Sequence, residues 1–250
     1  MQKIGIVIPC YNESQRFDRE QFVEFLKNNP SIDFCLVNDG STDDTGIILS
    51  ELTKSYRSRI TFVNMDVNAG KADAIRQGIL HGFHAKTYDY LGFIDADFSS
   101  PLSQINYLIT FCQGELKHSL IAGSRVQRMG ASIIRSSLRH YMGRIFATFA
   151  GFTLGLHMYD SQCGLKLVRT DVMDDLFGER FLTRWLFDIE LVLRMRNRFG
   201  KAMITSEILE VPLSVWHEKG ASKLKFKYLL RVPLDLIRIR IKYNKNLRQG

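Results

Sequence analysis

The sequence predicts an α/β fold, with a mostly parallel open sheet, helices on both of its faces and a C-terminal amphipathic elaboration. Short, nearly continuous apolar runs of the kind found in buried parallel strands alternate with segments of helical spacing in the first half. The apolar runs end in polar, acidic or glycine-containing stretches. With 250 residues, of which 45% are hydrophobic and 24% charged, the chain has the composition of an ordinary globular protein.

The alternation predicts the elements in order. Apolar runs place strands at 3–9, 34–38, 60–64, 90–94 and 120–122, and helical spacing places helices at 17–28, 42–56, 69–83 and 101–116. The second half breaks this rhythm, with a long helix expected at 132–152, a helix around 185–198 and a strand within 204–215. We expect one domain over 1–221 and a basic amphipathic tail over 222–250, because no repeat or low-complexity linker interrupts the chain.

The positive charge is concentrated in this tail. The net charge is +8, yet the first 221 residues carry 25 charges of each sign, and 222–250 hold nine Lys or Arg against one acid, Asp235. This distribution favours a local anionic partner and argues against a nucleic-acid-binding protein. Dense positive charge mixed with apolar residues is typical of helices on an anionic membrane surface. The alternation at 237–242 is strand-like and Pro233 interrupts the pattern, so a homo-oligomer interface is the alternative.

Cysteine usage and hydropathy indicate the compartment. Cys10, Cys35, Cys112 and Cys163 have no CxxC spacing and predict reduced thiols. The start MQKIGIVIPC is too short and too strand-like for a signal peptide. The run 145–159 has 15 uncharged residues, fewer than the about 20 that a membrane span needs. We expect a cytoplasmic protein that is peripheral on the cytoplasmic face of a membrane.

Two carboxylates, Asp95 and Asp97, follow the apolar run 90–94. Side chains at i and i+2 of an extended segment point to the same face, where two like charges are unfavourable unless a cation lies between them. The pair is therefore either a solvated turn or a cation site. Other polar groups follow the neighbouring strands at 9–13, 38–41 and 68–71, and ligands of open α/β sheets bind at this edge. This placement favours the cation site.

Eight motifs in order carry a family resemblance. The first five together resemble the family 2 glycosyltransferases with the GT-A fold: PCYNE (9–13), VNDGSTDDT (37–45), NAGKADAIRQG (68–78), FIDAD (93–97) and AGSR (122–125). The last three are similar to the branch that glycosylates polyprenyl phosphates: DSQCGLKL (160–167), RWLFDIEL (184–191) and HEKGASKL (217–224). The resemblance implies an inverting hexosyltransferase that uses a nucleotide-sugar donor, UDP-glucose before GDP-mannose, a polyprenyl-phosphate acceptor, and Mg²⁺ or Mn²⁺.

The resemblance also implies roles at the donor side. Asp97 is expected as a direct metal ligand, and Asp95 as a contact to metal, ribose or sugar, because hard cations prefer carboxylate oxygens and neutralise a diphosphate leaving group. Base and ribose are expected among the side chains of two strand ends, namely Pro9, Tyr11, Glu13 and Asp39. Donor phosphates and sugar are expected near Lys71, Gln162 and Lys166, and His217 and Lys223 flank a loop over the nucleotide.

At the acceptor side, the resemblance assigns the phosphate to Arg125 and Arg139, since guanidinium groups bind phosphate bidentately. Arg135 shares a helix face with Arg139, but a solvated role is as natural for it. A phosphate oxygen is already anionic at pH 7, so the transfer needs no general base, and Asp188 is expected to contact the donor sugar or orient an arginine.

Two other functions stay open from the sequence. If the acceptor is a hydroxyl group of a soluble or cell-surface glycan, Asp188 or Glu190 becomes the candidate base. A non-catalytic basic membrane or nucleic-acid binder on an α/β scaffold is the third hypothesis, against which the acidic motifs argue because they would repel an anionic polymer at the strand ends. The large side chain of Phe98, directly after the acidic pair, has no explanation in the sequence.

Overall fold

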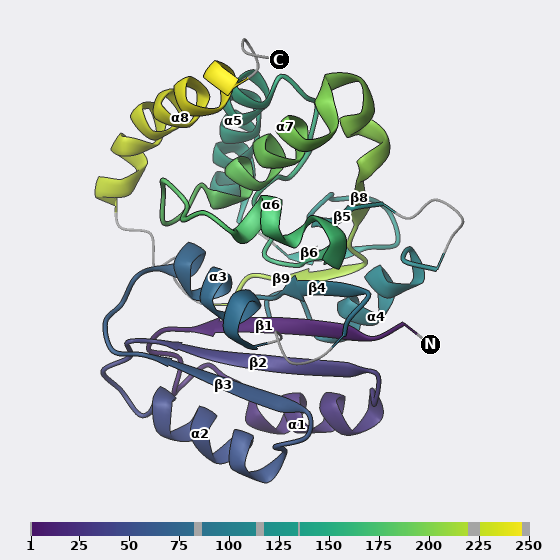
Figure 1. Cartoon of the computed structure of the whole chain (residues 1–250), viewed down its shortest axis with the longest axis vertical. Helices are drawn as coiled ribbons and strands as arrows, with labels where there is room; N and C mark the ends of the chain where they lie inside the picture. Colours follow the sequence, from purple (N-terminus) through teal and green to yellow (C-terminus); the bar gives the residue numbers. More distant parts are fainter. Residues whose placement is uncertain (1, 83–86, 114–117, 135, 220–225, 247–250) are drawn as a thin grey trace.

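A computed structural model of the chain describes residues 2–82, 87–113, 118–134, 136–219 and 226–246 (Figure 1). Seven strands form one open sheet in the order β3-β2-β1-β4-β7-β5-β8. Among these seven described strands, only β7 pairs in antiparallel fashion, with β4 and β5. The bounds are β1 Ile4–Cys10, β2 Ile32–Asp39, β3 Ile60–Met65, β4 Tyr90–Phe93, β5 Leu120–Ser124, β7 Lys166–Arg169 and β8 Ile208–Pro212. The predicted mostly parallel open sheet is confirmed.

Helices cover both faces of the sheet, as predicted (Figure 1). The core on one face includes α3 (Lys71–Gly82), α6 (Met173–Phe177) and α7 (Phe187–Glu207), with α5 (Ser137–Leu154) and α8 (Phe226–Asn246) packed against α7. The other face packs against α1 (Arg19–Asn28), α2 (Thr45–Ser55) and α4 (Ser103–Thr110). Strand β1 shows why both faces are apolar, since Val7 points to one core and Ile6 and Ile8 point to the other.

The second half departs from the predicted elements. The expected helix at 132–152 begins only at Ser137, because Ser132–Ile134 forms β6 and pairs with β9 (Val215–His217) in a separate two-stranded sheet. Helix α7 continues to Glu207, so the strand expected within 204–215 begins at Ile208. Strand β7, followed by the 3₁₀ helix η1 (Thr170–Val172), was not predicted. A lysine at its first residue hid its apolar pattern, and this lysine is fully buried in the structure.

The described part of the C-terminal segment is helical. Helix α8 runs through Pro233, and the strand-like alternation at 237–242 forms no strand. Leu236, Ile239 and Tyr243 are buried in the core shared with α5 and α7. The separate tail over 222–250 stays a prediction, and 222–225 and 247–250 lie outside the described residues. Within the described ranges, none of the helices combines the length and hydropathy that crossing a bilayer requires.

Candidate active site

The site lies where the sheet changes direction. From β1 the chain adds β2 and β3 on one side, whereas β4 pairs with the other side of β1. Ligands of open α/β sheets bind beyond the carboxyl ends of the strands at this switch point. In Figure 1 the carboxyl ends of β1, β2 and β3 lie together on the left, next to the first turn of α3. The side chains that follow these strands therefore form the candidate active site.

The acidic pair has a cation beside it. Asp95 and Asp97 are partly exposed, whereas Ala96 between them is buried. The Lys71 Nζ atom lies 2.5 Å from Asp95 Oδ1. Burial opposes the ionisation of Asp95, but the charge and hydrogen bond of Lys71, together with the charges of Arg125 and Lys166, outweigh it and lower the pKa of the carboxyl group. Burial likewise opposes the charge of Lys71, whose pKa is nevertheless raised, by Asp95 first. The two groups therefore form an ion pair.

The neighbours of the pair explain its geometry. A Cβ atom at Gly164 would lie 2.0 Å from Asp95 Oδ2, so only glycine lets this carboxylate occupy its place. The backbone N–H of Ser99 donates to Asp97 Oδ1 over 2.9 Å. Phe98 adopts a positive φ of 49° and is buried, with its ring centroid 5.3 Å from that of Phe17. Phe98 thus anchors the acidic turn to the core, a role that sequence reasoning missed.

Asp39 organises the loop that precedes Lys71. Its carboxylate is buried and accepts hydrogen bonds from the Asn68 side chain (3.0 Å) and from the backbone N–H groups of Ala69 (2.7 Å) and Gly70 (3.0 Å). Burial raises the pKa of Asp39, and these backbone donors oppose the rise. Its contact with the nucleoside stays a prediction, and the structure adds its role in holding this turn.

The loop after β1 is tied to the loop after β2. The backbone N–H of Asn12 donates to Ser41 Oγ (3.1 Å), and that of Glu13 donates to Thr45 Oγ1 (2.8 Å). The Glu13 carboxylate is buried and lies 2.8 Å from the Arg16 guanidinium. The two other predicted nucleoside contacts lie at the same end of β1, where Pro9 is partly exposed and Tyr11 is exposed.

A second ion pair lies beneath the acidic turn. Lys166 is fully buried, and its Nζ atom donates to Asp188 Oδ1 (2.7 Å) and to the Cys163 carbonyl oxygen (2.6 Å). Gln162 donates to the other Asp188 oxygen over 3.4 Å. Burial raises the pKa of Asp188 against the opposing charges of Lys166 and Lys71. Lys166 therefore holds Asp188, and its predicted contact with the donor stays a prediction.

Arg125 forms the third pair. Its Nε and Nη2 atoms donate to the two oxygens of Asp160 at 2.6 and 2.7 Å, and its guanidinium lies 5.4 Å from the ring centroid of Trp216. Glu210 fixes the Asp160 backbone N–H at 2.6 Å. Sequence reasoning missed the role of Asp160, although its motif was recognised. Arg139 belongs to α5, and its side chain, like Arg135 and Lys223, lies outside what the structure describes.

Asp188 and Glu190 have separate environments, as their i, i+2 spacing on a helix implies. Glu190 is fully buried and accepts hydrogen bonds from the backbone N–H groups of Leu182 (2.9 Å) and Thr183 (3.1 Å) and from the hydroxyl of Tyr243 (3.2 Å). Glu190 therefore fixes the loop before α7, and none of these hydrogen bonds involves the acidic pair.

The acidic pair has the donor atoms that Mg²⁺ and Mn²⁺ prefer. Such ions often take one or two protein carboxylates and complete their coordination with phosphate and water. Within the described ranges, no three or more His, Cys, Asp or Glu side chains gather to hold a metal, so a cation here would need ligand or water oxygens besides the acidic pair. Asp95 and Asp97 thus fit a divalent cation that also binds an anionic ligand.

Comparisons with known proteins agree with this geometry. The family model described as glycosyl transferase family 2 matches residues 5–177. Dolichyl-phosphate beta-glucosyltransferase ALG5D of Trichomonas vaginalis is 30% identical over 98% of this chain and 75% of its own length. The dolichyl-phosphate beta-glucosyltransferase of Saccharomyces cerevisiae is 31% identical over 96% of this chain and 75% of its own. The predicted resemblance to this branch is confirmed.

Solved structures agree on the fold. Glucosyl-3-phosphoglycerate synthase from Mycobacterium tuberculosis, in complex with Mn²⁺ and UDP-glucose, superposes with a TM-score of 0.67 at 19% identity, covering 97% of this chain and 79% of that one. Its complex with UDP gives a TM-score of 0.65 at 20% identity, covering 96% and 80%. At this identity the likeness establishes the fold class, and the predicted GT-A architecture is confirmed.

Proposed function

The chain belongs to glycosyl transferase family 2, and we propose that it transfers glucose from UDP-glucose to a polyprenyl phosphate. The observation that carries the proposal is the acidic pair at the switch point, surrounded by Lys71, Lys166 and Arg125, in a chain similar over nearly its whole length to dolichyl-phosphate glucosyltransferases. An acidic pair suits a metal-bound diphosphate, and the basic groups suit the phosphates of the donor and of a second, phosphate-bearing substrate.

At the donor side, Asp97 and Asp95 would hold Mg²⁺ or Mn²⁺, which neutralises the leaving diphosphate when bound. Lys71 adds a positive charge 2.5 Å from Asp95, where it can turn to a donor phosphate. The hydrogen-bonded loops after β1 and β2, with Tyr11, Glu13 and Asp39, would hold the base and ribose. Asp188, which accepts hydrogen bonds from the Lys166 ammonium and from Gln162, would contact the glucosyl group together with Gln162. Asp39, Lys71 and Asp188 already hold hydrogen bonds or ion pairs in the structure, which favours rate through positioning.

The environments of the two candidate bases favour a phosphate acceptor over a hydroxyl acceptor. A general base needs a lone pair within reach of the proton that it removes. Asp188 is ion-paired with Lys166, and Glu190 accepts hydrogen bonds from Leu182, Thr183 and Tyr243. A phosphate oxygen attacks without losing a proton, so an inverting single displacement needs no such base. Arg125 and Arg139 would hold that phosphate.

The side of the molecule formed by α5 and α8 has side chains suited to a membrane surface. Helices α5 and α8 lie side by side in Figure 1, and both carry large apolar side chains that are more than half exposed: Phe149, Phe152, Leu234, Ile237 and Ile241. Arg231, Arg238 and Arg240 are exposed on α8 as well. Apolar and basic side chains on one helix favour binding at an anionic interface. We propose peripheral binding there, on the cytoplasmic face, with a homo-oligomer contact as the alternative.

The enzymatic test supplies the protein with Mn²⁺, a polyprenyl phosphate and either UDP-glucose or GDP-mannose, and analyses the lipid products by mass spectrometry. We expect a β-linked glucosyl phosphate lipid, more product from UDP-glucose, and none after chelation of the metal. Transfer to a soluble glycan with no lipid product from either donor would contradict the proposal and favour the hydroxyl acceptor.

The membrane test compares flotation with vesicles containing or lacking anionic lipid. We expect binding to anionic vesicles, and its loss in the variant Leu234→Ser/Ile237→Ser/Ile241→Ser. The matched control is Ile47→Ser, since Ile47 is equally exposed but belongs to α2, on the other face of the sheet. Equal binding by both variants, or a dimer in sedimentation that the triple variant disrupts, would overturn the membrane assignment.

A further inference from the structure

We propose that Arg184 is a further donor-binding residue, which contacts the diphosphate of the nucleotide sugar, and that Glu190 and Tyr243 are positioning residues for it. The inference rests on the proposed function as a nucleotide-sugar transferase and extends it to a part of the chain beyond the matched range 5–177. It assigns the loop before α7 and the C-terminal helix α8 to the donor site.

The first observation is the contact between Arg184 and the turn before α3. A Cβ atom at Gly70 would lie 3.0–3.1 Å from the Cβ, Cγ and Cδ atoms of Arg184, so the methylene stem of the arginine lies flat against this glycine. Gly70 has a φ of 94°, which favours glycine independently. The Ala72 backbone N–H also points to the Arg184 carbonyl oxygen at 3.4 Å. Arg184 thus packs on the turn that precedes Lys71 and that is hydrogen-bonded to Asp39.

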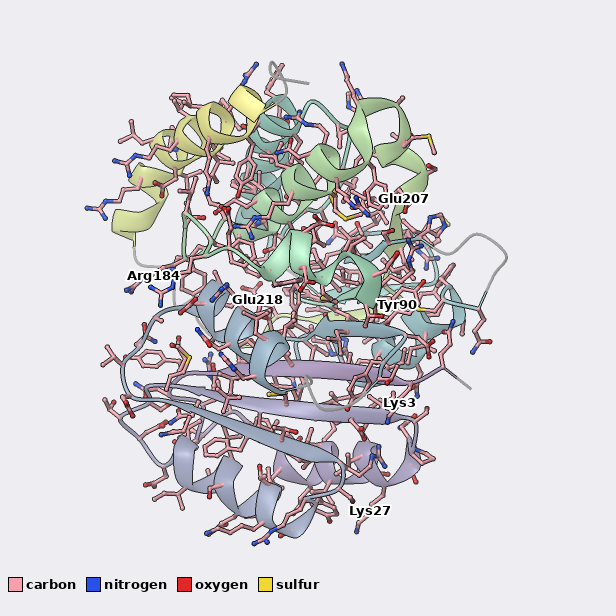
Figure 2. The ribbon with its side chains drawn as sticks, viewed as in Figure 1. Lys3, Lys27, Tyr90, Arg184, Glu207 and Glu218 are labelled. Carbon is pink, nitrogen blue, oxygen red and sulfur yellow. The ribbon has the colours of Figure 1, made fainter. Side chains whose placement is uncertain are left out.

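The second observation is where the guanidinium lies. Arg184 is an exposed residue, and Figure 2 shows it on the left, above the end of the sheet where the parallel strands finish. Its positive charge favours the ionised form of Asp39, against the effect of burial on the pKa of that carboxyl group. Lys71 and Arg184 therefore flank the same turn with two positive charges at the switch point. A guanidinium so placed offers bidentate N–H groups to a phosphate.

The third observation explains how the loop is held. The buried Glu190 carboxylate accepts from the backbone N–H groups of Leu182 and Thr183, directly before Arg184. The Thr183 hydroxyl accepts from the Leu186 N–H over 3.1 Å, which closes the loop on the other side of Arg184. An otherwise exposed arginine therefore projects from a backbone fixed at both ends.

Helix α8 completes this support. The Tyr243 hydroxyl donates to Glu190 over 3.2 Å and accepts from Arg194 Nε over 2.9 Å. Arg194 itself donates to the carbonyl oxygens of Leu176, Glu179 and Arg180. Tyr243 is buried, so α8 reaches the loop of Arg184 through a continuous chain of hydrogen bonds. This chain links the proposed membrane-facing helix to the donor side of the site.

The first experiment measures UDP and uridine binding by calorimetry in the presence of Mn²⁺. For Arg184→Gln we expect about tenfold weaker UDP binding and unchanged uridine binding, because one charge-assisted contact to phosphate is lost. Arg180→Gln, which removes an exposed arginine from the same segment, is the control and keeps wild-type affinity. Unchanged UDP binding, or equal losses for UDP and uridine, would overturn the assignment. A wild-type protein that binds no UDP would instead refute the proposed function.

The second experiment tests the positioning chain by a double-mutant cycle. Tyr243→Phe keeps the buried ring but removes the hydroxyl, and we expect about threefold weaker UDP binding with an unchanged kcat at saturating donor. In the Arg184→Gln background the same substitution should change UDP binding no further. A purely structural role would instead give equal losses in both backgrounds, and that result would overturn the positioning role of Tyr243.

Discussion

Replacing Gly164 by alanine tests whether the position of the Asp95 carboxylate sets the rate. The added Cβ atom would lie 2.0 Å from Asp95 Oδ2, 2.4 Å from Cγ and 2.7 Å from Oδ1, and all three separations are below the 3.0 Å at which such contacts cease to occur. The φ of Gly164 lies outside the left-handed region, so the backbone itself accepts alanine. The perturbation is therefore a displacement of one carboxylate.

The magnitude follows from this geometry. Moving Oδ2 from 2.0 Å to an allowed separation shifts the carboxylate by about 1 Å or more, and a misplacement of this size costs roughly 10²-fold in rate. The shift also stretches the 2.5 Å contact with Lys71. Asp95 is partly exposed, so it can move outward without unfolding the core. We expect kcat/KM to fall about a hundredfold with a small change in Tm.

The assay is the rate of lipid glucosylation over a range of Mn²⁺ concentrations, with Tm from circular dichroism. The variant should require more Mn²⁺ for half-maximal rate, because Asp95 no longer supports the cation. The control is Gly46→Ala in α2, whose Cβ would come no closer than 3.0 Å to another atom, Asn38 Nδ2, and should leave the rate unchanged. A folded Gly164→Ala protein with the wild-type kcat/KM at every Mn²⁺ concentration would refute the reasoning.

Three further predictions concern stability, measured by urea denaturation. Asp188→Asn leaves the ammonium of the fully buried Lys166 without its counter-charge and should cost about 3–5 kcal/mol, whereas Asp188→Leu/Lys166→Met should recover much of that loss. Burial opposes the ionisation of Asp160, but Arg125 lowers the pKa of Asp160 from 3.8 to about 2. The pair therefore contributes about 2 kcal/mol above pH 4 that is lost as the pH falls toward 2, and Asp160→Asn should flatten this dependence. Phe98→Ala should cost about 3–5 kcal/mol by removing a buried ring, and a loss below 1 kcal/mol would contradict its anchoring role.

The sequence predicts the first half of the fold well because its central strands β1, β2 and β4 are buried on both faces. Strands β1 to β4 are mostly apolar, and their predicted bounds agree with the structure within a few residues. Strand β7 was missed because its short apolar run is bounded by two basic residues, Lys166 and Arg169. The lysine can be buried in this strand because Asp188, 22 residues further along the chain, neutralises its charge. The pattern of neighbouring residues in the sequence cannot reveal a partner that is brought close only by the fold.

The candidate site divides in the same way. Polar residues at strand ends identify the edge where ligands bind, because the topology of a parallel sheet brings these ends together. The partners of each side chain depend on contacts across the fold, such as Lys71 with Asp95 and Arg125 with Asp160. Sequence reasoning therefore found the edge and its carboxylates but missed the role of Gly164, which is visible only once Asp95 lies against it.

One of the three ion pairs supplies a cation for Asp95, the first of the two carboxylates that follow the buried strand β4. Lys71, Arg125 and Lys166 were each predicted to bind a phosphate or the donor, and each lies on a carboxylate: Asp95, Asp160 and Asp188. Isolated charges at a partly buried edge would be costly, whereas paired charges are stable before any substrate binds. Under the proposed function, a donor diphosphate with its cation would exchange partners with groups that are already charged and oriented. In this arrangement the orientation of the charges is fixed during folding and need not be created during the reaction, which is the condition for electrostatic preorganisation.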